Sequence, residues 1–166
     1  MIFGEKNKFA IECYHDPLEN ENNRVFGRMC IWCSDTQLGD ITEPSCMLNV
    51  TEGFLQDFMN HPEILEGEEL NNLGDRELFE FLNKKLYLDD ERTTEEITKD
   101  AEKYFKYDFL TNGGESFDSH KSFLVKDEDI FKILFMHNDG NFSSCRVEGI
   151  EMAAVVKQFL SWIENE

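Results

Sequence analysis

The residues that could do chemistry begin with two cysteines in the stretch RVFGRMCIWCSDTQLGD. Cys30 and Cys33 form a C-x-x-C motif, a pattern found in redox centres and in metal sites. Here the motif lies in a run of β-forming residues rather than at the helix start that lowers the pKa of a redox cysteine. In a strand the two Cα atoms would be roughly 10 Å apart, beyond the limit of about 7 Å for a disulfide. We therefore expect two reduced thiols in a central strand and no metal site.

No other segment carries a catalytic motif. The four histidines, His15, His61, His120 and His137, fall in or next to expected loops and lie far apart in the sequence. Gly113–Gly114 is not followed by the Lys-Ser/Thr helix start of a phosphate-binding loop, so we interpret it as a turn that leads into a strand. The sequence predicts no catalytic residue, metal site or cofactor. An enzyme whose cysteines and histidines converge only in space remains an alternative.

Clustered carboxylates are the remaining candidates for a site. They are Glu66, Glu68 and Glu69 in EILEGEE, and Asp89, Asp90 and Glu91 in DDER. Neither cluster has the regular spacing of a calcium loop. Clusters of this kind are usually loop residues exposed to solvent. The more specific hypothesis is that they form a docking surface for a basic partner. We take both clusters as candidate partner-binding residues, and the hairpin around Asp139 as the next choice.

The overall charge narrows the choice of partner. The chain has 166 residues, with 35 acidic and 16 basic side chains and a net charge of −19. Such a chain repels phosphate, so we expect neither nucleic acid nor an anionic membrane as partner. A basic protein would be attracted. With five scattered cysteines, no apolar run long enough to cross a bilayer and no export signal, the sequence predicts a cytoplasmic protein. We expect this protein to be monomeric before it binds its partner.

Strand patterns occupy both ends of the chain. KFAIECY alternates, which places Glu12 and Tyr14 on the exposed face of a half-buried strand. RVFGRMCIWC is apolar on both faces, as in a central strand, and SDTQLGDI predicts a hairpin with a short return strand. Three later strands are expected in KSFLVK, DIFKILFMH and FSSCRV. The last two are joined by Asp139–Gly140, a strong hairpin signal.

Helical spacing marks three middle segments and the C-terminus. The middle helices are expected to begin at Asn49, Asp75 and Thr93, which are suitable N-cap residues. The third of these carries an apolar stripe of Ile97, Ala101, Tyr104 and Phe105. The last helix begins near Ile150, and its apolar face contains Met152, Val155, Val156, Phe159, Leu160 and Ile163.

Together these elements predict a single domain over residues 1–166 with an α+β fold. Hairpin-linked strands imply a largely antiparallel β-sheet of about five to six strands. About three to four helices, including the C-terminal amphipathic helix, would pack on this sheet. The expected order is three strands, the middle helices, three more strands and the final helix.

Several segments of the chain resemble the immunity protein 42 family. They are MIFGEKNKFAIE, VFGRMCIWCSDTQLGD, and GGESFDSHKSFLVK leading into FKILF. The shared features are glycines at turns and aromatic residues in strands. The resemblance spans most of the chain and is strongest over residues 1–14, 25–40 and 113–137. The middle helices, from Glu63 to Lys106, carry no match. Members of this family are small cytosolic proteins encoded beside polymorphic or contact-dependent toxins of bacteria.

The resemblance implies a non-catalytic immunity protein that binds the C-terminal domain of one cognate toxin. Inhibition would be stoichiometric and would need no cofactor, and the resemblance assigns no binding residues. A nuclease toxin fits the charge, because an acidic protein can fill the basic cleft with which a nuclease meets phosphates. Two alternatives stay open: a small cytosolic enzyme with converging Cys and His residues, and an acidic adaptor without a toxin partner.

Overall fold

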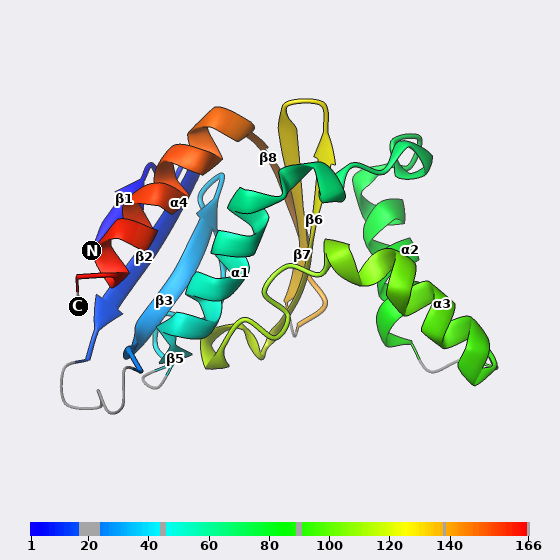
Figure 1. Ribbon diagram of the computed structural model, residues 1–166, viewed down its shortest axis with the longest axis horizontal. Coiled ribbons are helices and arrows are strands. Elements are labelled where there is room, and N and C mark those ends of the chain that lie inside the picture. Colours follow the sequence, from blue (N-terminus) through cyan, green and yellow to red (C-terminus); the bar gives the residue numbers. More distant parts are fainter. Residues whose placement is uncertain (17–23, 44–45, 89–90, 138, 166) are drawn as a thin grey trace.

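The computed structural model describes residues 1–16, 24–43, 46–88, 91–137 and 139–165, without the side chain of Glu68. In this part of the chain, four α-helices accompany two antiparallel sheets of five and three strands (Figure 1). The predicted α+β class and the antiparallel pairing are confirmed. The strands are divided between two sheets rather than joined in one, because the middle helices enter between the two groups of strands.

The first sheet is built on the central pair β2 and β3. Its order is β1-β2-β3-β4. The short strand β5 pairs with the N-terminal end of β3, whereas β4 pairs with the C-terminal end. The strands are β1 (Ile2–Gly4), β2 (Phe9–His15), β3 (Phe26–Cys33), β4 (Thr36–Leu38) and β5 (Cys46–Met47). The register places Ile11 opposite Ile31. The strands expected from KFAIECY and RVFGRMCIWC are confirmed, whereas β1 and β5 are too short to show an alternating pattern and were not predicted.

The alternation in β2 was wrong for Glu12, which was expected on an exposed face. Its side chain is buried, and the residue is only 8% exposed. Its carboxylate accepts hydrogen bonds from Lys6 Nζ at 2.6 Å, Tyr14 OH at 2.8 Å and Trp32 Nε1 at 2.8 Å. Burial alone would raise the pKa of Glu12, but these three bonds outweigh it and lower the pKa. A carboxylate with this many donors can be buried without being left unsatisfied.

The second sheet has the order β6-β7-β8. Its strands are β6 (His120–Asp127), β7 (Ile130–His137) and β8 (Phe142–Glu148). All three were predicted, and the turn between β7 and β8 contains Asp139 and Gly140, as expected. Gly140 has φ of 82°, a left-handed conformation that suits glycine in such a turn. This sheet packs on the helix Asp75–Tyr87, where the ring centroid of Phe79 lies 5.2 Å from that of Phe123 in β6.

The helices are those that the sequence predicted, and three of the four begin one residue away from the expected start. They are α1 (Leu48–Asn60), α2 (Asp75–Tyr87), α3 (Thr94–Tyr104) and α4 (Gly149–Ile163). Short 3₁₀ helices lie at Pro62–Leu65, Glu68–Leu70, Phe105–Tyr107 and Glu115–Phe117. None of the helices in the described ranges is long and apolar enough to span a membrane.

The N-cap predictions had different outcomes. Thr93 caps α3 as expected: its hydroxyl accepts from the Glu96 backbone N–H, and the Glu96 carboxylate accepts from the Thr93 N–H at 2.8 Å. Asn49 is not a cap, because α1 already begins at Leu48 and the Asn49 side chain accepts from the Val25 backbone N–H instead. Asp75 is the first helical residue of α2, and its carboxylate is engaged across the fold by residues of β8.

The apolar stripe expected for α3 is only partly buried. Tyr104 is buried and its ring packs against Phe81 of α2 with centroids 5.2 Å apart. Ile97 and Phe105, in contrast, are 41% and 54% exposed. Helix α3 lies at the outer edge of the molecule against α2 (Figure 1), and part of its apolar side is left exposed.

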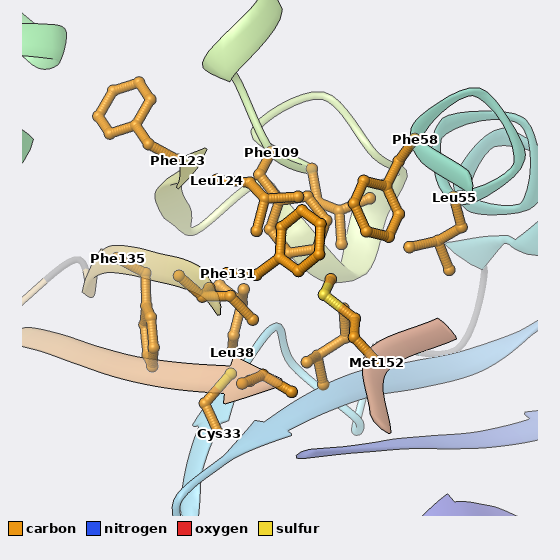
Figure 2. Close-up of a cluster of buried hydrophobic side chains, with 14 of the residues drawn as sticks. Cys33, Leu38, Leu55, Phe58, Phe109, Phe123, Leu124, Phe131, Phe135 and Met152 are labelled. Atoms are coloured by element: carbon orange, nitrogen blue, oxygen red, sulfur yellow. The ribbon is translucent and has the colours of Figure 1, made fainter. Parts of the chain in front are cut away.

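The core joins both sheets through α1 and α4. Both helices lie over one face of the first sheet (Figure 1). On α4, Phe159 is fully buried and its ring packs against Phe3 of β1 with centroids 6.5 Å apart. Towards the second sheet, Phe58 of α1 meets Phe131 of β7 edge to face, with centroids 5.0 Å apart (Figure 2). Apart from the half-buried Leu160, the predicted face of the C-terminal helix is buried as expected.

Candidate functional site

The C-x-x-C motif lies within β3, as predicted, and its two thiols have different neighbours. Both cysteines are buried and unbridged. Cys30 stands opposite the buried Glu12 in the strand register, whereas Cys33 lies beside the thiol of Cys145 from the second sheet. Burial, with a smaller contribution from Glu12, raises the pKa of Cys30 to about 12. A thiol so rarely ionised is a poor nucleophile and a poor metal ligand.

Two of the four histidines do come together. His120 and His137 face each other across β6 and β7, with Nε2 of the first 3.0 Å from Nδ1 of the second. The Ser119 hydroxyl lies 2.8 Å from His120 Nδ1. Burial, followed by the neighbouring His137, lowers the pKa of His120. Spacing alone could not reveal this pair, because 17 residues separate its members in the chain.

The histidine pair does not extend into a metal centre. His61 lies apart from it, at the end of α1, where its Nδ1 is 3.5 Å from the Glu63 carboxylate. Among the described residues, no group of three or more His, Cys, Asp or Glu side chains is placed to hold a metal ion. Among the described residues, the groups that converge here are two imidazoles and one hydroxyl, with the carboxylates of Asp40 and Asp139 near enough to act on the pKa of His120.

Gly113–Gly114 forms the turn that the sequence predicted, ahead of β6. The Gly113 carbonyl accepts a hydrogen bond from the Thr51 hydroxyl of α1. Gly114 has φ of 119°, and a Cβ there would lie 2.9 Å from the sulfur of Cys46. The turn thus holds α1 against the first sheet, and its glycines are explained by close packing.

In the first acidic cluster, the described carboxylates form ion pairs within the protein. The Glu66 carboxylate lies 2.5 Å from Lys126 Nζ at the end of β6, and the Glu69 carboxylate lies 2.7 Å from Lys103 Nζ on α3. Both glutamates remain more than half exposed at their side chains. The side chain of Glu68 lies outside the described residues. The Glu69–Lys103 pair is exposed on both sides, so it contributes little to stability and can exchange partners. The Lys126 side chain is only 18% exposed, so its pair with Glu66 is better shielded from solvent.

The second acidic cluster lies at the other end of α2. Glu91 is exposed just before α3, and Asp89 and Asp90 lie outside the described residues. Helix α2 has 13 residues, which separates its ends by roughly 20 Å at about 1.5 Å per residue. The described members of the two clusters therefore lie apart, at opposite ends of α2. Helix α2 runs beside α3 (Figure 1).

At the β7–β8 hairpin, the carboxylate of Asp139 is already engaged within its own turn. It accepts hydrogen bonds from the Asn141 backbone N–H at 3.0 Å and from the Asn141 side-chain amide at 2.6 Å. These bonds, led by the backbone one, lower the pKa of Asp139. The residue is exposed, so this turn remains accessible to a partner.

One concave feature escaped the sequence analysis. A groove of about 640 Å³ lies between the C-terminal end of α1, the β6–β7 turn and the start of α4. Phe58 and Phe131 form its apolar floor, and the carboxylate residues Asp129 and Glu148 line it. The charged turn between β6 and β7 was visible in the sequence, but its proximity to α1 depends on the tertiary fold.

Comparisons with known proteins agree with this architecture. The chain superposes on a crystal structure of CdiI from Burkholderia dolosa AUO158 with a TM-score of 0.70 and 14% sequence identity, over 98% of this chain and 99% of that one. At this identity the likeness establishes the fold. No curated protein sequence matches the chain. The family model described as immunity protein 42 matches residues 1–162. The chain therefore belongs to the immunity protein 42 family.

Proposed function

We propose that this immunity protein neutralises its cognate toxin by forming a stoichiometric complex, without turnover of a substrate. The chain would act in the cytoplasm as a single domain over residues 1–166, monomeric until it meets the toxin. The observation that carries the proposal is the net charge of −19 in a member of a toxin-immunity family. An inhibitor of this kind needs no nucleophile, metal or cofactor, and the buried thiols of β3 suit a structural role.

The partner that fits this charge is a toxin C-terminal domain with a basic surface. Opposite charge steers two proteins together and speeds their encounter. A nuclease meets the requirement, because its cleft must attract phosphate. By occupying that cleft, an acidic inhibitor would exclude the substrate and use the toxin's own electrostatics for recognition.

The candidate contact residues are the acidic clusters at the two ends of α2. They are Glu66, Glu68, Glu69, Asp89, Asp90 and Glu91. The pairing of Glu66 with Lys126 and of Glu69 with Lys103 is compatible with this role. The Glu69–Lys103 pair is exposed on both sides, and exposed ion pairs contribute roughly 0–1 kcal/mol, so a toxin lysine or arginine could replace Lys103 at little cost.

The experiment is to co-express the chain with the C-terminal domain encoded by the gene directly upstream, and to purify the complex. We expect growth to be restored and a complex of fixed stoichiometry to form. Charge reversal of each cluster to lysine should slow association while the melting temperature stays near that of wild type. A matched control reverses Glu5, Glu80 and Glu164, which changes the net charge by the same amount at other exposed positions.

Each outcome of this experiment has a distinct meaning. If both cluster variants associate as fast as the control, the interface lies elsewhere and the Asp139 hairpin is tested next. If the chain protects cells without binding the toxin domain, or consumes a substrate, stoichiometric inhibition is wrong and the enzyme alternative gains support. If no upstream toxin gene exists, the acidic adaptor becomes the better interpretation.

A further inference from the structure

The groove at the start of α4 combines a rigid apolar floor with an exposed apolar edge. Phe58 and Phe131, which line the groove, pack edge to face with an interplanar angle of 85°. Figure 2 shows the two rings side by side. Met59 of α1 and Ala153 of α4 complete its apolar lining. At about 640 Å³ the groove can accept one or two large side chains.

Ile150 stands at the edge of this groove without a role in the fold. It is 80% exposed, the highest value among the large hydrophobic side chains of the described residues. The buried face of α4 begins only at Met152. An isolated exposed isoleucine needs no explanation, but one beside an apolar groove extends a surface that a partner could cover.

The charges around the groove are arranged to receive a cation. Its lysine, Lys126, is already held by Glu66 at 2.5 Å. Asp129 and Glu148 also line the groove, and no salt bridge of either carboxylate is found within the part of the chain that the structure describes. Glu148 is nevertheless near enough to Lys8 to raise the pKa of that lysine. Glu66, a member of the first acidic cluster, does not line the groove but contacts its Lys126.

We propose that this groove receives the cognate toxin, and that the toxin segment seated in it carries a large apolar side chain flanked by lysine or arginine. The inference rests on the proposed function and specifies its contact surface. The apolar side chain would fill the space above Phe58 and Phe131 and cover Ile150. The flanking cations would meet Asp129 and Glu148. Well-packed apolar anchors with complementary charge at the rim are the usual arrangement of energetically important contacts in protein interfaces.

A second copy of this chain is a poorer occupant of the groove. In a symmetric dimer built on this surface, the same acidic groove of both copies would face each other. Each protomer would also bring its net charge of −19. Both effects oppose self-association and favour a basic partner.

The test measures the affinity of purified variants for the toxin domain encoded directly upstream. Ile150→Lys places a cation where the basic partner should dock, and Ala153→Trp fills the groove without changing the charge. We expect each to raise the Kd by at least about 30-fold, the level of an interface hot spot. Ile97→Lys is the matched control: it alters an exposed isoleucine on α3, and its Kd should stay within about twofold of wild type. Melting temperatures establish that every variant is folded.

The outcomes separate the groove from the proposed function. If wild type binds the toxin domain and both groove variants bind equally well, the groove is not the contact surface and the inhibitor proposal stands. If Ile150→Lys instead converts a wild-type dimer into a monomer in light scattering and leaves the toxin affinity unchanged, the groove serves self-association and the inference is overturned. If wild type does not bind the toxin domain at all, the proposed function fails and the inference fails with it.

Discussion

At the level of single residues, the two cysteines of the C-x-x-C motif and Glu12 of β2 are buried. Cys30 and Cys33 share a strand but face different neighbours, and burial raises the pKa of both thiols. Glu12, the one buried carboxylate of β2, is held by three donors on the same face of the sheet. Burial disfavours ionisation of the two thiols, whereas the three donors keep Glu12 ionised.

The cysteines should therefore be unreactive in the folded protein. We expect iodoacetamide at pH 8 to modify the thiols slowly in the native state and completely in urea, because only unfolding exposes thiols that can ionise. Mass spectrometry of the alkylated protein counts the modified residues. Intact mass under non-reducing conditions should correspond to the fully reduced chain. A Cys30–Cys33 bridge, or zinc bound in stoichiometric amount, would contradict the geometry of β3.

The histidine pair should make stability sensitive to mild acid. Burial and His137 hold the pKa of His120 below its ordinary value of 6.5, while Asp40 and Asp139 oppose this shift. The unfolded chain therefore binds a proton first as the pH falls, so the stabilising contribution is complete above pH 6.5 and is lost as the pH falls towards the folded pKa. Between pH 8 and pH 5, the melting temperature of wild type should therefore fall more than that of His120→Gln, which cannot take up this proton. A constant difference over this range would contradict the coupling.

At the level of elements, long patterned segments were predictable and short or partly covered ones were not. Helix α4 was found from its apolar spacing, and α3 from its Thr93–Glu96 capping box, because both signals are local. The apolar stripe of α3 predicted that Ile97 and Phe105 are buried, but both are exposed. Residue spacing alone cannot show whether another element covers a helix. Strand β1 is three residues long, too short for any periodic signal.

The C-terminal helix should be essential to the core. Replacing Phe159 with Ala should lower the free energy of unfolding by about 3–5 kcal/mol, because the fully buried ring would leave a cavity beside Phe3. Ile150→Ala is the control on the same helix and should cost less than about 0.5 kcal/mol, since its side chain is exposed. Urea unfolding monitored by circular dichroism gives both values. Equal midpoints for the two variants would place α4 at the periphery of the fold.

The cap of α3 should make a smaller, separable contribution. Thr93→Ala removes the acceptor for the Glu96 N–H and should destabilise the protein by about 1 kcal/mol. Thr93→Ser keeps the hydroxyl and serves as the matched control. The two are compared by the same urea titration, and a Thr93→Ala variant as stable as Thr93→Ser would show that α3 is held by its packing on α2 alone.

At the level of the whole molecule, the α+β class could be predicted from the sequence. The arrangement of the two sheets and the groove that it creates could not. Each hairpin could be read from its own residues, as with Asp139–Gly140. The division into two sheets could not, because it depends on how α1 and α4 fill the space between them. The groove joins Phe58, Phe131 and Ile150, which are far apart in the chain, so no local pattern contains it. The acidic clusters were visible as residue types, and the helix between them was predicted, but the ion pairs of Glu66 with Lys126 and of Glu69 with Lys103 depend on the tertiary fold.

The net charge leads to a prediction about the kinetics of toxin binding. With a charge of −19, the long-range field should steer a basic partner, so the association rate should fall steeply as salt is added. The screening length shortens from about 10 Å at 0.1 M salt to about 3 Å at 1 M salt. We expect the association rate to drop by about tenfold or more over this range, while the dissociation rate, set by desolvated contacts, changes less. Stopped-flow mixing of wild type and of the lysine-reversed acidic clusters measures both rates. The reversed variants should show a shallower salt dependence than wild type. An association rate that is independent of salt would mean that shape, rather than charge, selects the partner.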